Sequence, residues 1–181
     1  MTYYGAKEIA ESFRTVRKNT IIIAQEIPAE KYSFRAAPET RSVAEMLTHI
    51  ALSYVFQHQV HAVERKTNLE GFDFPSLLQK IWGEEKQPRS KEQIIELLCT
   101  NGDKWAGWVD TLTEPFLAER VQMPAGMPVP AKSRFEMIIS VKEHEMHHRG
   151  QLILIERMLG IVPHLTREMQ ARMATVTAAK A

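Results

Sequence analysis

Apolar residues recur at intervals of three and four along four long stretches of the chain, which is the spacing of one face of an α-helix. In the first stretch Pro28 ends the repeat, because the residue before a proline avoids the helical conformation. The other three stretches open at Ser42, Ser90 and Ser133, each three residues before a glutamate or glutamine, which is the capping-box pattern of a helix start. We predict helices over residues 9–27, 42–65, 90–112 and 133–159.

The connections between these helices are long and contain several prolines and glycines. Residues 66–89 include a possible short helix at 76–82, and residues 113–132 form a proline-rich crossing. Connections of this length are uncommon in compact domains, so we expect both to border a site. No stretch shows the alternation and turn signals of a β-hairpin. The pattern therefore predicts an all-α fold, and four amphipathic helices suggest a four-helix bundle.

Length and composition are those of an ordinary globular domain. The 181 residues, 44% hydrophobic and 25% charged, are enough for one full-sized core and too few for two. We expect the domain to span residues 1–165 and residues 166–181 to form a C-terminal tail that frays. The single cysteine, Cys99, lies in an apolar run and is expected to be a core residue in a reducing compartment.

Charge and hydropathy exclude two classes of partner. The net charge is +1 and the basic residues are dispersed among acids, so nucleic-acid binding is not expected. The longest apolar run is far shorter than the roughly 20 residues that a bilayer requires, so no membrane association is expected. No apolar signal region precedes the charged residues near the N-terminus, which predicts a cytoplasmic protein.

The last predicted helix carries a pair of histidines on its apolar face. His144 and His148 lie one turn apart and about 40° from each other around the helix, among the positions of Met137, Val141 and Ile155. An unpaired polar group in a core costs on the order of 1–3 kcal/mol, so buried imidazoles need partners. A divalent metal ion is a partner that both imidazoles can share.

A metal site of this kind usually takes a third protein ligand and leaves a position for water. His49 is the candidate, because it lies on the apolar side of the second predicted helix. The alternative is that His49, His144 and His148 are hydrogen-bonded core histidines. His147, at the edge of the stripe, is an alternative partner for His144.

The remaining histidines are expected to lie outside the site. His58 follows His49 by nine residues and so points to roughly the opposite side of the helix. We expect His58 and His61 to be solvated or partly exposed, and His164, which follows Pro163 in a turn, to lie at the surface.

Two sequence strings make the chain resemble the DinB/YfiT-like family of metal-dependent proteins. They are Ser42-x-x-Glu45-x-Leu47-x-His49-Ile50 and His144-x-x-x-His148-Arg149-Gly150-Gln151-Leu152. The resemblance extends over nearly the whole chain. It implies a four-helix bundle with up-down-down-up order and long crossing loops, frequent homodimers, and one divalent metal ion, zinc or nickel, bound by three histidines. Some relatives transfer low-molecular-weight thiols or use them as isomerisation cofactors.

Matched residue by residue, the resemblance makes His49, His144 and His148 the metal ligands. Gln151 belongs to the same string and could hydrogen-bond a ligand imidazole or a bound water, as outer partners of metal ligands do. No departure from the ligand pattern is found in this sequence.

Three classes of function fit these residues. The first is a metal-dependent enzyme of thiol S-transferase or hydrolase type, which would act on a small molecule through a metal-activated water or thiol. The second is a non-enzymatic metal-binding protein of the stress response. The third is a zinc peptidase, because His144-Glu145-x-x-His148 also fits H-E-x-x-H, with Glu145 as general base and Glu168 as third ligand. Glu145 at the flank of the stripe and the absence of a predicted sheet disfavour this third class.

Overall fold

The computed structural model describes residues 4–178, which are mostly helical with one small sheet. The elements in chain order are α1 (Ala6–Glu26), the 3₁₀-helix η1 (Ala29–Lys31), α2 (Val43–Leu52), α3 (Val55–His58), the π-helix η2 (Gln59–Val63), α4 (Phe74–Glu85), α5 (Lys91–Asp110), α6 (Glu114–Ala118), β1 (Arg120–Gln122), β2 (Ala131–Ser133), α7 (Arg134–Met158) and α8 (His164–Ala178). The all-α prediction is therefore right for the bulk of the chain and misses the sheet.

The predicted helix starts coincide with real capping boxes. The hydroxyls of Ser42, Ser90 and Ser133 each accept a hydrogen bond from the backbone N–H three residues on, at 3.1 to 3.3 Å. The side chains at those third positions accept from the serine N–H in return. Each pair of bonds satisfies two backbone donors that the first helical turn leaves free, which is why α2, α5 and α7 begin there.

The predicted helix over residues 42–65 is interrupted. It consists of α2, a turn at Ser53 and Tyr54, the single turn of α3, and then η2, where the N–H of Glu64 donates to the carbonyl of Gln59 at 2.9 Å. A π-turn holds one more residue than an α-turn, so it rotates all later side chains around the axis. Side-chain directions that are extrapolated from α2 along one regular helix therefore do not hold after η2.

His61 is fully buried, so the prediction that it is solvated or partly exposed was wrong, whereas His58 is partly exposed as expected. The guanidinium of Arg134 donates to His61 Nδ1 at 2.8 Å, and His61 Nε2 donates to Gln57 Oε1 at 3.0 Å. Burial, and then the charge of Arg134, lower the pKa of His61 to about 3. His61 is thus a neutral core residue.

His164 is also buried, which corrects the expectation of a surface residue. Its Nε2 donates to Oδ1 of Asn19 on α1 at 3.2 Å, because the start of α8 packs against the body. Residues 164–178 form the helix α8, so this part of the tail expected to fray is helical, and residues 179–181 lie outside the described residues. The division of the chain at residue 165 remains a prediction.

The two long connections contain more regular structure than the sequence predicts. The expected short helix at 76–82 is the twelve-residue α4. The crossing at 113–132 contains α6 and an antiparallel hairpin in which Val121 of β1 pairs with Lys132 of β2. Strands of three residues are too short to give a readable alternation.

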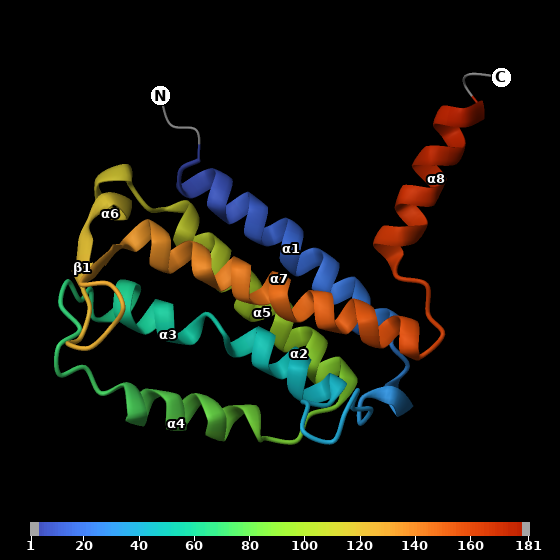
Figure 1. Cartoon of the computed structure of the whole chain (residues 1–181), viewed down its shortest axis with the longest axis horizontal. Coiled ribbons are helices and arrows are strands. Elements are labelled where there is room, and N and C mark those ends of the chain that lie inside the picture. Colours follow the sequence, from blue (N-terminus) through green and yellow to red (C-terminus); the bar gives the residue numbers. More distant parts are fainter. Residues whose placement is uncertain (1–3, 179–181) are drawn as a thin grey trace.

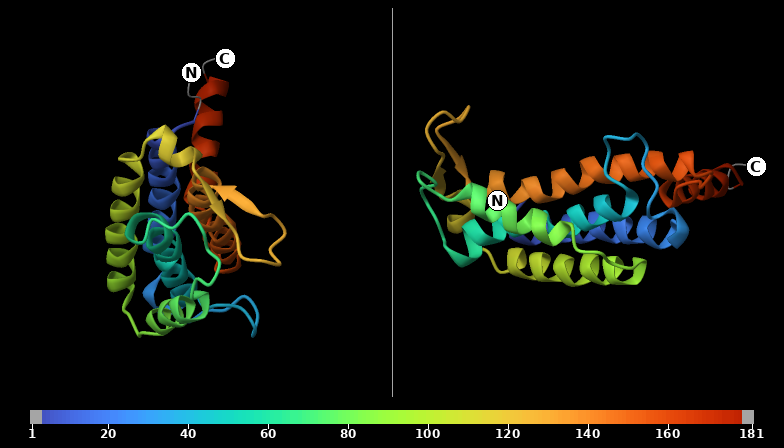
Figure 2. Two further views of the ribbon diagram at one scale, coloured as in Figure 1. Left: turned by 90° about the vertical axis from the view of Figure 1, so that its left-hand side faces the viewer. Right: turned by 90° about the horizontal axis from the view of Figure 1, so that it is seen from below.

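The long helices α1, α2, α5 and α7 lie side by side along the longest axis of the molecule (Figure 1). Their buried faces form two apolar clusters, one around Leu47, Leu98 and Leu152 and one around Phe13 and Trp105. Helix α4 lies outside α2 and α3 and has no buried residue, while α8 leaves the body at an angle (Figures 1 and 2).

A buried ion pair crosses the interior between these helices. Arg17 of α1 donates to both carboxylate oxygens of Glu145 on α7, at 2.9 to 3.1 Å, and both side chains are at most 5% exposed. The same guanidinium donates to the carbonyls of Leu98 on α5 and Ile50 on α2. Gly102 makes room for it, because a Cβ there would lie 2.9 Å from Arg17 Cγ. The side chain of Arg17 therefore connects α1 with α2, α5 and α7.

Removal of one partner of this pair should destabilise the fold strongly. We expect Glu145→Gln or Arg17→Met to lower the free energy of unfolding by about 3–5 kcal/mol, because each leaves a buried charge without its counter-charge. Urea denaturation measures the loss. The matched control is Arg14→Met, which breaks the Arg14–Asp110 pair at the surface and should cost less than about 1 kcal/mol. Equal losses in the two cases would contradict the assignment.

The buried His61 should make stability depend on pH. In the unfolded chain it binds a proton near its ordinary pKa of about 6.5, whereas in the folded protein it does so only near 3. Between these values the unfolded state holds the extra proton, so stability falls as pH decreases, by up to about 1.4 kcal/mol per unit for this group. His61→Gln should flatten the profile of unfolding free energy between pH 6 and 4. Parallel profiles would refute the account.

Candidate metal centre

The three histidines singled out from the sequence lie together. His49 Nε2 is 3.2 Å from His144 Nε2, which is in turn 3.2 Å from His148 Nε2. One ring nitrogen of each residue lies within 4.8 Å of the other two. His49 comes from α2 and the others from adjacent turns of α7. We refer to His49, His144 and His148 as the histidine trio.

Two further side chains orient the outer rings of the trio. His49 Nδ1 donates to Oε1 of Glu85 at 2.7 Å, and His148 Nδ1 donates to Oε1 of Gln151 at 2.8 Å. Gln151 was predicted in this role. Glu85, at the end of α4, was not, because nothing in the sequence relates a loop acid to a histidine 36 positions earlier.

The hydrogen-bond acceptors around the trio leave ring nitrogens whose lone pairs could bind a cation. The atoms of Glu85 and Gln151 that contact these rings are oxygens, so His49 and His148 in their neutral form carry their protons on Nδ1 and present Nε2 lone pairs to His144. His144 Nε2 can donate at most one hydrogen bond, so at least one of the two 3.2 Å contacts brings lone pairs face to face. Its buried Nδ1 has no hydrogen-bond partner among the described residues. A metal ion accepting three lone pairs removes this conflict.

Two of the three distances between the ligand nitrogens match those expected around such an ion. Zinc–nitrogen bonds of about 2.0–2.1 Å at a tetrahedral angle place ligand nitrogens about 3.3 Å apart. Both contacts of His144 are 3.2 Å. No fourth histidine, cysteine or acid within residues 4–178 joins the group. The trio could therefore hold one metal ion and leave coordination positions open.

The lowered pKa of His144 and of His148 favours the neutral imidazoles that bind metal ions. Burial first, and then the neighbouring His148 and His49, lower the pKa of His144 to about 4. Burial also lowers the pKa of His148, although its hydrogen bond with Gln151 opposes the shift. Neutral imidazoles are the form that binds metals, so at pH 7 protons compete weakly for these two nitrogens.

Two clefts reach the trio from different sides. The α4 cleft, of about 300 Å³, is lined by His49 and His144 together with mostly apolar side chains. Its apolar lining residues are Leu52, Phe56, Leu78, Ile81, Trp82 and Val141. The arginine cleft, of about 610 Å³, is lined by His148 and Gln151 together with Arg35, Glu39, Arg41 and Glu45. A small molecule can approach the trio from either cleft.

Glu145 and Glu168, which the peptidase alternative requires at the metal, do not face the histidine trio. The carboxylate of Glu145 is bound by Arg17 inside the body, so it is not free to act as a general base at the trio. Glu168 lies on α8 and pairs with Arg172 at 3.7 Å. His147, the alternative partner of His144, is exposed. These placements give the peptidase function no support.

Comparison with known proteins identifies the family of this chain. Residues 12–152 match the sequence profile of the DinB superfamily. The chain belongs to the DinB superfamily. A relative in this group, the uncharacterized protein YjoA of Bacillus subtilis (strain 168), is 24% identical over 157 residues, which are 86% of this chain and 91% of YjoA.

Solved structures share the fold of this DinB-superfamily chain. The crystal structure of YjoA, a DinB-like protein, has a TM-score of 0.62 at 23% identity and covers 84% of this chain and 92% of its own. An uncharacterized protein of Clostridium difficile 630 has a TM-score of 0.66 at 15% identity, covering 87% and 98%. A protein of Streptococcus pneumoniae has a TM-score of 0.66 at 18% identity, covering 87% and 93%. At these identities the likeness is one of fold.

Within residues 4–178 no helix has the length and apolar character needed to cross a bilayer.

The outer partners of the trio should control metal affinity. We expect Glu85→Gln and Gln151→Leu each to weaken metal binding by about 10–100-fold, because each removes or weakens the acceptor that fixes a ligand ring. Competition against a chromophoric chelator measures the affinity. His58→Ala, which removes a partly exposed imidazole that packs against Tyr54 and Trp108, is the control and should bind as the wild type does. Unchanged affinity in both variants would show that the rings are held by packing alone.

Proposed function

We propose that this protein is a divalent-metal-dependent enzyme of thiol S-transferase or hydrolase type, with zinc or nickel held by His49, His144 and His148. The observation that carries the proposal is the convergence of three Nε2 atoms, 3.2 Å apart in two pairs, between two clefts. A structural metal site is normally closed by four protein ligands, whereas a catalytic site keeps a position open.

The metal ion would supply Lewis-acid chemistry, lowering the pKa of a water or thiol so that it becomes a nucleophile near neutral pH. The chain's own residues supply the positioning. Glu85 and Gln151 hold two of the imidazoles in the orientation that directs Nε2 inward. The α4 cleft offers a mostly apolar wall on one side of the trio, and the arginine cleft offers hydrogen-bonding groups on the other.

The proposal includes the architecture and the partners expected from the family. We infer the up-down-down-up order of a four-helix bundle, which is supported by the directions of α1, α2, α5 and α7 (Figure 1). We also propose a small-molecule partner, in particular a low-molecular-weight thiol, a homodimeric assembly and a cytoplasmic location.

The non-enzymatic alternative is weaker on one specific ground. A metal that serves only as a structural staple would be expected to have a fourth ligand from a protein side chain. Within residues 4–178 no fourth histidine, cysteine or acid lies in the group. The open positions therefore favour a metal that meets a substrate.

Elemental analysis of the purified protein tests the metal site. We expect one metal ion per chain in the wild type. His49→Ala, His144→Ala and His148→Ala should each lose far more affinity than the outer-partner variants, because each removes a direct ligand. His147→Ala should retain the metal. Full retention by His49→Ala would overturn the three-histidine site.

A separate titration tests the enzymatic half of the proposal. Small thiols are added to the cobalt-substituted protein, whose visible absorption reports the ligands around the metal. We expect the spectrum to change and turnover to follow with a suitable acceptor. Metal bound by the trio, together with an unchanged spectrum and no turnover, would favour the non-enzymatic role.

A further inference from the structure

Arg41 is a cationic side chain beside the histidine trio with most of its hydrogen-bonding capacity unused. It precedes the N-cap of α2 and lines the arginine cleft together with His148 and Gln151. Figure 2 shows the segment between η1 and α2 standing beside α7. Within residues 4–178 the guanidinium makes no hydrogen bond, and its sole ion pair is a 3.9 Å approach to Glu85. A guanidinium has five N–H donors, so Arg41 is free to bind a ligand.

Arg35, the other arginine of this cleft, differs from Arg41 because its guanidinium makes hydrogen bonds within the protein. Arg35 donates to the carbonyl of Thr40 and to Oε1 of Glu45 at 2.6 Å. Its charge is therefore matched by Glu45, and its donors hold the loop. Arg41 has no such structural task.

The charges around the trio favour an anionic ligand. Arg41 lies next to the outer partner of His49, because a guanidinium nitrogen of Arg41 is 3.9 Å from a carboxylate oxygen of Glu85. The imidazoles bind metal in their neutral form, so they leave the charge of a divalent ion uncompensated. Among the described residues, Glu85 is the carboxylate that hydrogen-bonds the trio, through His49 Nδ1.

We propose that Arg41 binds a carboxylate group of the substrate, so that the substrate class is small carboxylates whose reacting group lies at the histidine trio. The planar guanidinium matches a carboxylate with two parallel hydrogen bonds. A singly charged carboxylate suits the arginine cleft better than a doubly charged phosphate, because Glu39 and Glu45 also line it. The proposal rests on the metal-dependent function above and deepens it by naming the substrate class.

Two matched probes test the proposal in the cobalt-loaded protein. They are 3-mercaptopropionate and its methyl ester, which differ in the negative charge, and binding is followed by cobalt absorption. We expect Arg41→Met to weaken 3-mercaptopropionate about tenfold, as loss of a charge-assisted hydrogen bond does at a partly exposed site, and to leave the ester unchanged. Arg41→Lys should fall between, because it keeps the charge without the planar fork.

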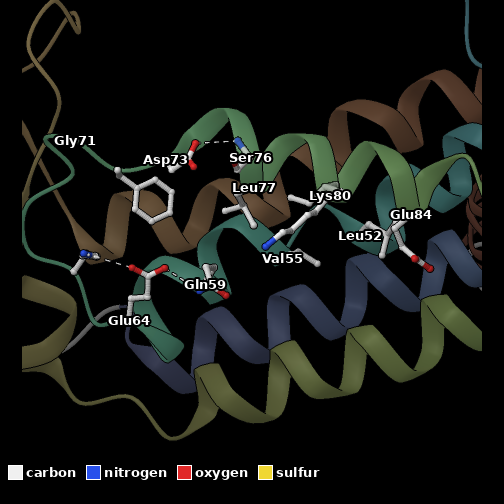
Figure 3. Close-up of a pocket in the computed structure, with 13 residues that line it drawn as sticks. Leu52, Val55, Gln59, Glu64, Gly71, Asp73, Ser76, Leu77, Lys80 and Glu84 are labelled. Carbon is white, nitrogen blue, oxygen red and sulfur yellow. Dashed lines mark hydrogen bonds and ion pairs between the residues drawn. The ribbon is translucent and has the colours of Figure 1, made fainter.

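Lys80→Met is the charge-matched control. Lys80 of α4 lines a different cleft, between α3 and α4, together with Val55 and Leu77 (Figure 3). This variant changes the net charge by the same amount and should bind both probes as the wild type does. Equal weakening by Lys80→Met and Arg41→Met, or no weakening by Arg41→Met, would overturn the proposal.

A measurement without metal separates this inference from the proposed function. In the metal-free protein, the Nε–H resonance of Arg41, identified by its absence in Arg41→Met, should shift with 3-mercaptopropionate and not with the ester. If this resonance shifts but the trio binds no cobalt, the proposed metal-dependent function is refuted and the carboxylate site at Arg41 is supported. Cobalt binding by the trio without this shift would keep the function and remove the role of Arg41.

Discussion

The ion pair between Arg17 and Glu145 is the interaction on which the arrangement of the interior depends. Burying two charges costs several kcal/mol per ion unless both are fully hydrogen-bonded. Here the carboxylate receives three hydrogen bonds, and the remaining donors of the guanidinium reach carbonyls of α2 and α5. Such a pair tolerates little displacement. It therefore constrains the rotation of α1, α2, α5 and α7 and the shift of each helix along its axis.

That constraint acts directly on the histidine trio. Glu145 follows His144 in the chain, and Ile50, whose carbonyl accepts from Arg17, follows His49. When Glu145 faces Arg17, the rotation of α7 directs His144 and His148 toward α2. The hydrogen bonds of His49 with Glu85 and of His148 with Gln151 then fix the rings. Folding energy is thereby used to bring three imidazole nitrogens together before any ion arrives.

The surroundings of the trio are asymmetric. The α4 cleft is mostly apolar and is formed by a helix with no buried residue, whereas the arginine cleft carries charged groups from the loop before α2. An apolar wall strengthens electrostatic interactions at the trio by excluding water, and a charged wall selects ligands by sign. Each cleft takes part of its lining from a connecting segment, where functional variation in a helical scaffold concentrates, and the rest from helices of the body.

The sequence by itself determined what depends on local geometry. Three serine capping boxes marked helix starts, and the four-residue interval of His144 and His148 put both on one face. Only the tertiary structure decided what depends on contacts between distant segments. His61 is buried within the π-helix η2, and the partners of Arg17 and Glu85 lie 128 and 36 positions away in the chain. Helix periodicity tells which face a residue occupies, but packing decides what that face meets.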